Sequence, residues 1–207
     1  MLRLYDNWTS GNGFKIRLLL AKLGLRYEWI DLDIDQAQTR TPEFLAKNPN
    51  GRIPLLELED GTYLPESNAI LCYLAEGTPY LPTERLARAQ VLQWLFFEQY
   101  SHEPNIATLR YWRHHPVDMS GWRAHARAPK FEAGVAALGV METHLAHRDF
   151  FVGPRLSIAD IALYAYTHVA EEGGFTLQPF PSVRAWLDRV AADHPHVRIT
   201  DRPGASS

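Results

Sequence analysis

The sequence of 207 residues contains one cysteine, Cys72, so the chain can form neither an internal disulfide nor a two-cysteine redox motif. Cysteine-poor chains suit a reducing compartment, and we expect a cytoplasmic location. No apolar run approaches the roughly 20 residues that a membrane-spanning helix needs. The opening residues Met1–Tyr5 predict a strand and no signal peptide. The absences therefore predict a cytoplasmic protein without a membrane partner.

An excess of charge of one sign is also missing. The chain has 21 basic and 24 acidic residues, for a net charge of −3, and this does not favour a nucleic-acid partner. The nine histidines form no HExxH motif. Asp31, Asp33 and Asp35 alternate with apolar residues, which indicates a solvated strand face more than a cation site. We therefore expect no metal.

The hydrophobic fraction of 46% and the charged fraction of 22% are those of an ordinary globular protein. The first part alternates strands and helices, and the second is helical. Two prolines near Gly77–Pro82 indicate a linker. The pattern predicts domains at 1–77 and 87–207, joined by the linker 78–86. The expected strands are 2–5, 27–34 and a hairpin over 55–64. The expected helices are 16–23, 42–46, 85–111, 130–147, 157–170 and 182–192, and one that opens at 66–68 and continues through the apolar run 70–74. Pro104 is expected to interrupt the longest helix, and disorder is expected after Thr200.

A proline-containing loop and a hairpin form the most informative segment, Asn48–Pro54 followed by Asp60-Gly61. Asp-Gly between two strand-like runs predicts a hairpin in which both turn residues have positive φ. Pro54 has no N–H to donate to a ladder, so the backbone entering this strand can face a ligand. The helix that begins after Glu66-Ser67 would present unpaired N–H groups to a carboxylate. The segment predicts an extended, anionic, peptide-like ligand.

These residues, together with Ser10-Gly11-Asn12-Gly13 and the later Leu156–Ala162, resemble the bacterial glutathione S-transferases of the serine/asparagine type, theta-like or nu-like. The resemblance covers nearly the whole chain. It implies a thioredoxin-like α/β N-terminal domain, an all-α C-terminal domain, glutathione as co-substrate and a homodimer. It further implies a cis bond before Pro54, main-chain pairing of Ile53 with glutathione, and binding of the γ-glutamyl end by Glu66 and Ser67.

The turn after the first strand is where αβ folds place ligands, and the resemblance assigns it the glutathione sulfur. Ser10 is the first candidate for the donor to the thiolate, Asn12 the second and Thr9 the third. Ordinary turn and helix-capping chemistry is the alternative for Ser10 and Asn12. Capping is likewise the alternative for Glu66 and Ser67. Further candidates for glutathione contacts are Arg52, whose alternative is a solvated loop charge, and Gln38, Thr39 and Lys47.

Aromatic residues of the first turn and the long helix are candidates for the pocket of the second substrate. The resemblance assigns this pocket to Trp8, Tyr100, Glu103 and Tyr111, whereas aromatics at helical spacing ordinarily pack in a core. Such a pocket suits a small hydrophobic electrophile. Ser157 and Asp160 have the spacing of a capping box, so we interpret them as a folding device and exclude them from catalysis.

Three functions remain open at this stage. The first is a glutathione transferase that activates the thiol for attack on an electrophilic carbon. The second is glutathione-dependent reduction of a disulfide or a peroxide, which the lack of a cysteine near Ser10 permits only through a second glutathione. The third is a non-catalytic binding or scaffold protein, because one fold can serve unrelated functions.

Overall fold

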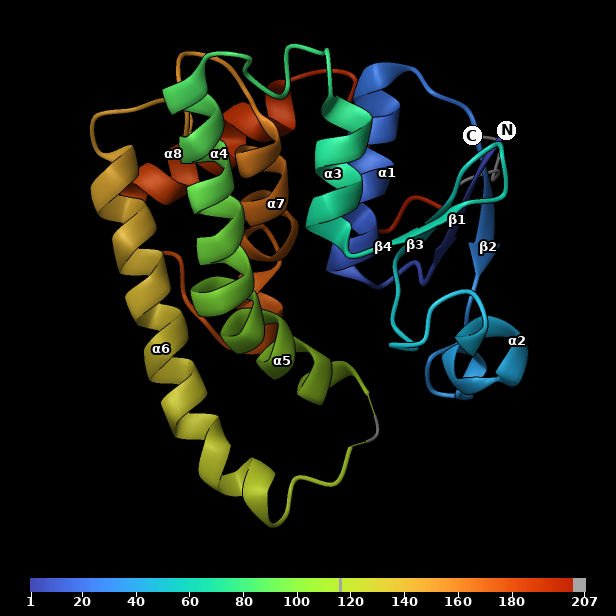
Figure 1. Cartoon of the computed structure of the whole chain (residues 1–207). Helices are drawn as coiled ribbons and strands as arrows, with labels where there is room; N and C mark the ends of the chain where they lie inside the picture. The colour runs from blue at the N-terminus through green and yellow to red at the C-terminus, as the bar shows by residue number, and fades with distance from the viewer. Residues whose placement is uncertain (116, 203–207) are drawn as a thin grey trace. The chain divides into compact units, whose positions relative to one another are not determined.

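The computed structural model of the chain describes residues 1–115 and 117–202. It divides into two units (Figure 1). The first unit comprises Met1–Glu76 and the C-terminal segment that begins at His194, and the second comprises Gly77–Asp193. The fold class expected from the sequence is confirmed, since a mixed sheet with helices forms the first unit and helices form the second.

The first unit is built on a four-stranded sheet in the order β2-β1-β3-β4. The central strand β1 runs parallel to β2 and antiparallel to β3, and β3 and β4 form the hairpin. Helices α1 and α3 lie side by side against the sheet (Figure 1). Their apolar faces form the core with the strands. The elements are β1 (Leu2–Asp6), α1 (Gly11–Leu23), β2 (Tyr27–Asp31), the 3₁₀-helix η1 (Gln38–Arg40), α2 (Pro42–Leu45), β3 (Leu55–Glu57), β4 (Tyr63–Pro65) and α3 (Ser67–Ala75).

The hairpin turn differs from the one expected. Gly61 has a φ of 83°, whereas Asp60 does not: among the non-glycine residues described, only Ala37 and Glu66 have positive φ. Leu58 N–H donates to Thr62 O (2.8 Å) and Gly61 N–H donates to Leu58 O (3.0 Å). The connection is therefore a three-residue loop closed by a glycine bulge, so one positive φ suffices.

Strand β2 ends at Asp31, three residues before the expected end at Ile34. The alternation of apolar and acidic residues continues, but the Asp33 carboxylate accepts the N–H groups of Asp35 (2.9 Å) and Gln36 (3.1 Å). Aspartate competes in this way with ladder hydrogen bonds and turns the chain. The predicted strand was too long because its polar positions are turn formers.

The second unit is helical. Its long first helix is interrupted as expected: α4 (Arg85–Phe97) passes into a π-helical turn, η2 (Glu98–His102), and α5 (Glu103–His114) resumes with Pro104 in its first turn. The remaining elements are α6 (Trp122–Leu145), α7 (Ile158–Thr167), η3 (Ala170–Gly173) and α8 (Pro181–Ala192). Helix α6 begins eight residues before the predicted Lys130 and includes Pro129. Within the part of the chain that the structure describes, no helix has the length and apolar character to cross a membrane.

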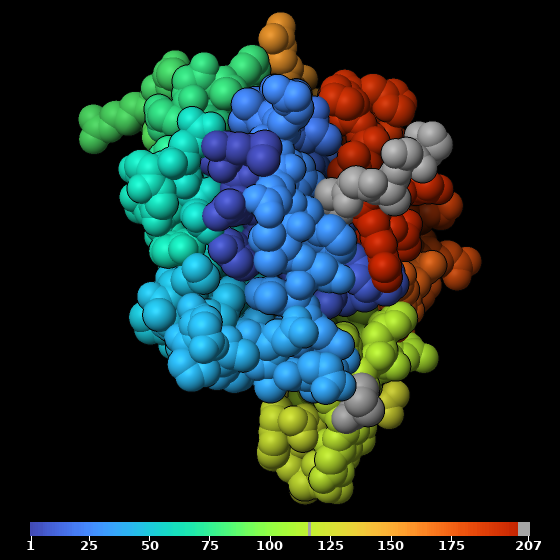
Figure 2. Space-filling model, turned by 90° about the vertical axis from the view of Figure 1, so that its right-hand side faces the viewer, coloured from blue at the N-terminus to red at the C-terminus, as the bar shows by residue number. Residues whose placement is uncertain are grey.

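The C-terminal segment is anchored to α1 of the first unit. The Arg17 guanidinium donates to the carbonyls of Ile199 (3.1 Å) and Asp201 (3.0 Å), and Lys22 Nζ donates to Pro195 O (3.3 Å). Figure 2 shows the last red residues beside the blue N-terminal ones. We expected disorder after Thr200, but Asp201 and Arg202 are placed by contacts; residues 203–207 lie outside the described part.

Candidate functional site

The site begins at the turn between β1 and α1. Ser10 is the N-cap of α1, where its Oγ accepts the N–H of Gly13 at 3.2 Å and its own N–H donates to Asn7 O at 2.9 Å. The capping alternative is thus observed for the Ser10 oxygen. A hydroxyl that accepts still has a proton to donate, so Ser10 stays a candidate donor to a thiolate.

Thr9 is occupied within the same turn. Its N–H (3.1 Å) and its hydroxyl (2.5 Å) both donate to Asn7 Oδ1, and Asn7 Nδ2 donates to Leu32 O (3.0 Å). A hydroxyl has a single proton, and in Thr9 this proton is directed at Asn7. The role of Thr9 as a donor to the glutathione sulfur stays a prediction.

A buried ion pair lies next to this turn and is hydrogen-bonded to its backbone. The Asp6 carboxylate and the Arg17 guanidinium are 3.2 Å apart, both are buried, and Arg17 also donates to Trp8 O (2.9 Å). Burial raises the pKa of Asp6 to about 7, although Arg17 acts in the opposite direction. Gly13 is required here because a Cβ on it would collide with the Asp6 carboxylate.

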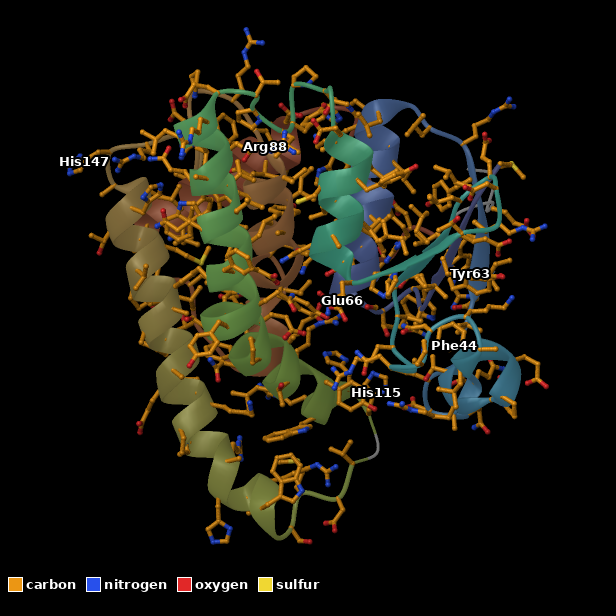
Figure 3. The ribbon with its side chains drawn as sticks, viewed as in Figure 1. Phe44, Tyr63, Glu66, Arg88, His115 and His147 are labelled. Atoms are coloured by element: carbon orange, nitrogen blue, oxygen red, sulfur yellow. The ribbon has the colours of Figure 1, made fainter. Side chains whose placement is uncertain are left out.

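Helix α3 begins at a strained residue. Glu66 has φ 72° and ψ 111°, and its side chain makes no capping hydrogen bond. A non-glycine residue in such a conformation costs about 1–3 kcal/mol and is found most often at binding and active sites. The Glu66 side chain is exposed at the start of α3 (Figure 3). The side-chain capping proposed as an alternative for Glu66 is therefore not observed.

Ser67 connects the two helix starts. It is buried, and its hydroxyl donates to Asn12 Oδ1 at 3.3 Å instead of capping α3. The structure thus brings together two predicted residues that are 55 positions apart. Lys15 Nζ donates to the same hydroxyl at 3.3 Å and to Asn68 Oδ1 at 3.4 Å. The sequence reasoning missed Lys15; a lysine between Phe14 and Ile16 on an apolar helix was the available signal.

The loop before β3 presents the backbone of Ile53. The Ile53–Pro54 bond is cis, as the resemblance implied. Asn48 Nδ2 donates to Arg52 O (2.8 Å), and this contact holds the loop, while Pro54 is buried and the Arg52 side chain is exposed. The sheet ladder starts only at Leu55. The backbone of Ile53 therefore lies outside the ladder, as a ligand-pairing residue requires.

The weaker candidates of this loop have mostly internal contacts. Gln38 Oε1 accepts the N–H of Asp33 (2.7 Å). Lys47 Nζ donates to the hydroxyl of Tyr63 (2.8 Å) and lies over the Tyr63 ring (Figure 3). Thr39 is buried within η1. These contacts explain the positions of Gln38 and Lys47 without a ligand.

The predicted pocket residues fall in different units. Trp8 belongs to the first unit, where the Arg202 guanidinium lies 4.8 Å from its ring centroid. Tyr100, Glu103 and Tyr111 belong to the second, on η2 and α5. Tyr100 is 88% exposed, so core packing does not account for it. Tyr111 stacks on His115 at 4.0 Å between ring centroids. Within residues 1–115 and 117–202, no group of three or more His, Cys, Asp or Glu side chains is arranged to hold a metal ion.

A thioredoxin-like unit with a cis-proline loop, followed along the chain by a helical unit, defines the class of proteins with the glutathione transferase fold. The sequence model of the glutathione S-transferase N-terminal domain matches residues 1–76, and that of the C-terminal domain matches residues 122–189. The chain belongs to the glutathione S-transferase family.

Solved structures and curated relatives agree with this assignment. A crystal structure of glutathione S-transferase from Pseudomonas fluorescens Pf-5 is 52% identical, with a TM-score of 0.93, over 97% of this chain and 99% of that one. A glutathione transferase from Burkholderia graminis, solved with two glutathione molecules per subunit, is 31% identical, with a TM-score of 0.83, over 99% and 89% of the two chains. Protein URE2 of Eremothecium gossypii is 32% identical over 90% of this chain, which spans only 64% of that relative's length.

Proposed function

We propose that this protein is a glutathione transferase that activates the glutathione thiol for attack on a small hydrophobic electrophile. The observation that carries the proposal is the hydrogen bond between Ser67 and Asn12. Ser67, which is assigned to the γ-glutamyl end, and Asn12, which is assigned to the sulfur, lie at the N-termini of two helices, and this hydrogen bond joins them. Glutathione bound there would have its carboxylate and its thiolate near the positive ends of two helix dipoles.

Glutathione binding would rest on main-chain and side-chain groups of the first unit. The Ile53 backbone beside Pro54 would pair with the cysteinyl residue, and Glu66 and Ser67 would hold the γ-glutamyl end. Arg52, exposed in this loop, would approach a glutathione carboxylate, and Thr39, which is buried in η1, would supply a further contact. Strain at Glu66 supports its role, because backbone strain is retained where it positions a group for binding.

The chemical step needs a thiolate. A cysteine thiol has a pKa near 8.5, so only a few per cent is ionised at neutral pH. Donation from Asn12 Nδ2 or the Ser10 hydroxyl, together with the α1 dipole, favours the ionised form. The thiol proton passes to solvent, the sulfur forms a bond to the electrophilic carbon, and the leaving group departs with its electron pair. Trp8, Tyr100, Glu103 and Tyr111 are proposed to receive the electrophile.

An ultraviolet titration of enzyme-bound glutathione tests the assignment, because the thiolate absorbs and the thiol does not. We expect the wild type to lower the thiol pKa by one unit or more, and Asn12→Ala or Ser10→Ala to reverse this shift. The same variants should lose conjugation activity with an aryl halide. If neither substitution raises the thiol pKa or lowers the activity, the proposed catalytic role is wrong.

Disulfide or peroxide reduction is a second candidate. The Burkholderia graminis relative, solved with two glutathione molecules per subunit, favours it, because reduction without a protein thiol consumes two glutathione molecules. One glutathione thiolate would attack the disulfide, forming a mixed disulfide and releasing one thiolate of the substrate. The second glutathione thiolate would attack the glutathione sulfur of the mixed disulfide, giving oxidised glutathione and releasing the other substrate thiolate. A hydroxyethyl-disulfide assay run beside the aryl-halide assay separates the two reactions. Failure to bind a glutathione resin would instead favour the scaffold function.

We further propose a cytoplasmic homodimer with a role in detoxification. Leu92 and Phe96 lie four residues apart on α4 and are 38% and 71% exposed, so they form an apolar stripe that a second copy would cover. The single cysteine agrees with a reducing compartment. Sedimentation of the wild type and of Phe96→Asp tests the dimer: we expect a dimer and a monomer, respectively.

A further inference from the structure

Lys15 lies on α1, the first helix of the candidate site, and is fully buried. A lysine is rarely fully buried unless its ammonium group has partners. Here the Nζ atom is 3.3 Å from Ser67 Oγ and 3.4 Å from Asn68 Oδ1. Lys15 also lies three residues after Asn12, so both side chains are on one face of α1. The buried cation is therefore behind the Ser67–Asn12 contact.

The chemistry of lysine gives this network a direction. An ammonium group donates three hydrogen bonds and accepts none, so Ser67 Oγ must be the acceptor from Lys15. The hydroxyl then has its single proton for Asn12 Oδ1, 3.3 Å away. Because Asn12 receives this proton at its carbonyl oxygen, the other end of its amide, the Nδ2 donor, is turned away from Ser67. The order of donation is Lys15 to Ser67 to Asn12.

We propose that Lys15 is a positioning residue that fixes the Asn12 amide with its donor end toward the glutathione sulfur. This inference rests on the proposed role of Asn12. An asparagine amide is nearly symmetric in shape, and its orientation is set by its hydrogen-bond partners. Without Lys15, the Ser67 hydroxyl can accept from Nδ2, and the flipped amide would place an oxygen beside a thiolate. Lys15 acts through Ser67 and touches no reacting atom.

The test uses Lys15→Met, which keeps the length of the side chain and removes its donors and charge. The readout is the thiol pKa of bound glutathione at saturating concentration, because a loss of affinity or stability does not by itself move it. We expect a rise of about one unit, a tenfold change in the ionisation constant, with a matching shift of the pH–rate profile. Lys22→Met is the matched control, since Lys22 is also buried on α1 but donates to Pro195 O; it should leave the thiol pKa unchanged.

Two further variants show whether Lys15 acts through Ser67 and Asn12 or acts on the sulfur directly by its charge. Ser67→Ala keeps the cation but breaks the chain, and it should raise the thiol pKa as Lys15→Met does. Ser67→Ala also tests the proposal if Lys15→Met does not fold. Asn12→Ala with Lys15→Met should behave like Asn12→Ala alone, because Lys15 acts through Asn12. An additive rise in the double variant would mean that the lysine charge acts on the sulfur directly, and it would overturn the positioning role.

The same series separates this inference from the proposed function. A thiol pKa that rises in Asn12→Ala but not in Lys15→Met or Ser67→Ala would overturn the role of Lys15 and leave that of Asn12 intact. A thiol pKa unchanged in Asn12→Ala would overturn the role of Asn12 itself, whichever result Lys15→Met gives.

Discussion

Two helices of this protein start with the same kinds of side chain, a serine and an acid, but use them differently. At the start of α7, Ser157 and Asp160 form a complete capping box, so this sequence-based prediction is confirmed. At the start of α3, Ser67 turns its hydroxyl to Asn12 on another helix, and Glu66 has no capping bond. The residue types are nearly equivalent, but the hydrogen bonds are not.

The Asp160 carboxylate is satisfied within the protein. One oxygen accepts from Phe151 N–H and Trp186 Nε1–H, both at 3.0 Å, and the other accepts from the backbone N–H and the hydroxyl of Ser157, both at 2.9 Å. Burial raises the pKa of Asp160, and these hydrogen bonds oppose the rise. The group links three segments of the second unit and presents nothing to a ligand.

The comparison gives a criterion for separating structural from binding residues. A polar group that is buried and fully hydrogen-bonded stabilises the fold. A residue that has a strained backbone conformation and an exposed side chain does not stabilise its own helix in this way. Such a residue is a candidate for ligand binding. Asp160 meets the first description and Glu66 the second. Substitutions at the two acids should therefore have opposite effects on stability and on glutathione binding.

The largest expected effect is on the stability of Asp160→Ala. Removal of the carboxylate leaves several buried donors without a partner, and we expect the free energy of unfolding to fall by about 3–5 kcal/mol. Urea unfolding followed by tryptophan fluorescence measures it. Glu66→Ala should change the same quantity by less than about 1 kcal/mol. Equal losses in the two variants would show that the comparison does not separate structural from binding acids.

A second buried acid, Asp6, should make stability depend on pH. Its pKa is raised by burial to about 7 from an ordinary value of 3.8, so the folded protein retains a proton that the unfolded chain releases. The Asp6 contribution is present in full below pH 3.8 and is lost as the pH rises to about 7. The change is on the order of a few kcal/mol. Asp6→Asn should flatten the pH dependence of the unfolding free energy between pH 4 and 7, and an unchanged slope would contradict the assignment to Asp6.

Glutathione binding should depend strongly on Glu66, whereas the stability of the fold should not. Glu66→Gln removes the charge that would pair with the γ-glutamyl amine, and we expect glutathione affinity to fall by about 10- to 100-fold, or about 1.4–2.8 kcal/mol. Isothermal titration calorimetry measures the affinity. Glu76→Gln, at the other end of α3, is the matched control and should bind as the wild type does. Equal affinities in wild type and Glu66→Gln would remove Glu66 from the site.

The sequence predicted the features that depend on neighbouring residues. The capping box at Ser157, the hairpin at Gly61 and the interruption before Pro104 each follow from a few adjacent positions. The contacts that make the candidate site join distant positions: Lys15 and Ser67 are 52 residues apart, and Arg17 and Ile199 are 182 apart. No local pattern marks such partners. Nor does a glutamate mark a positive φ, so the strain at Glu66 was hidden from the sequence.

The smallest expected effect isolates that strain. Glu66→Gly and Glu66→Ala both remove the carboxylate, but only glycine adopts φ 72° without steric cost. We expect Glu66→Gly to be more stable than Glu66→Ala by about 1 kcal/mol, because relief of 1–3 kcal/mol of strain exceeds the extra entropy that glycine loses on folding. Urea midpoints of the pair measure the difference. If the alanine variant is equally stable, Glu66 stores no strain; if glycine is the more stable, the protein keeps a glutamate there at a cost to its fold, as a binding residue would require.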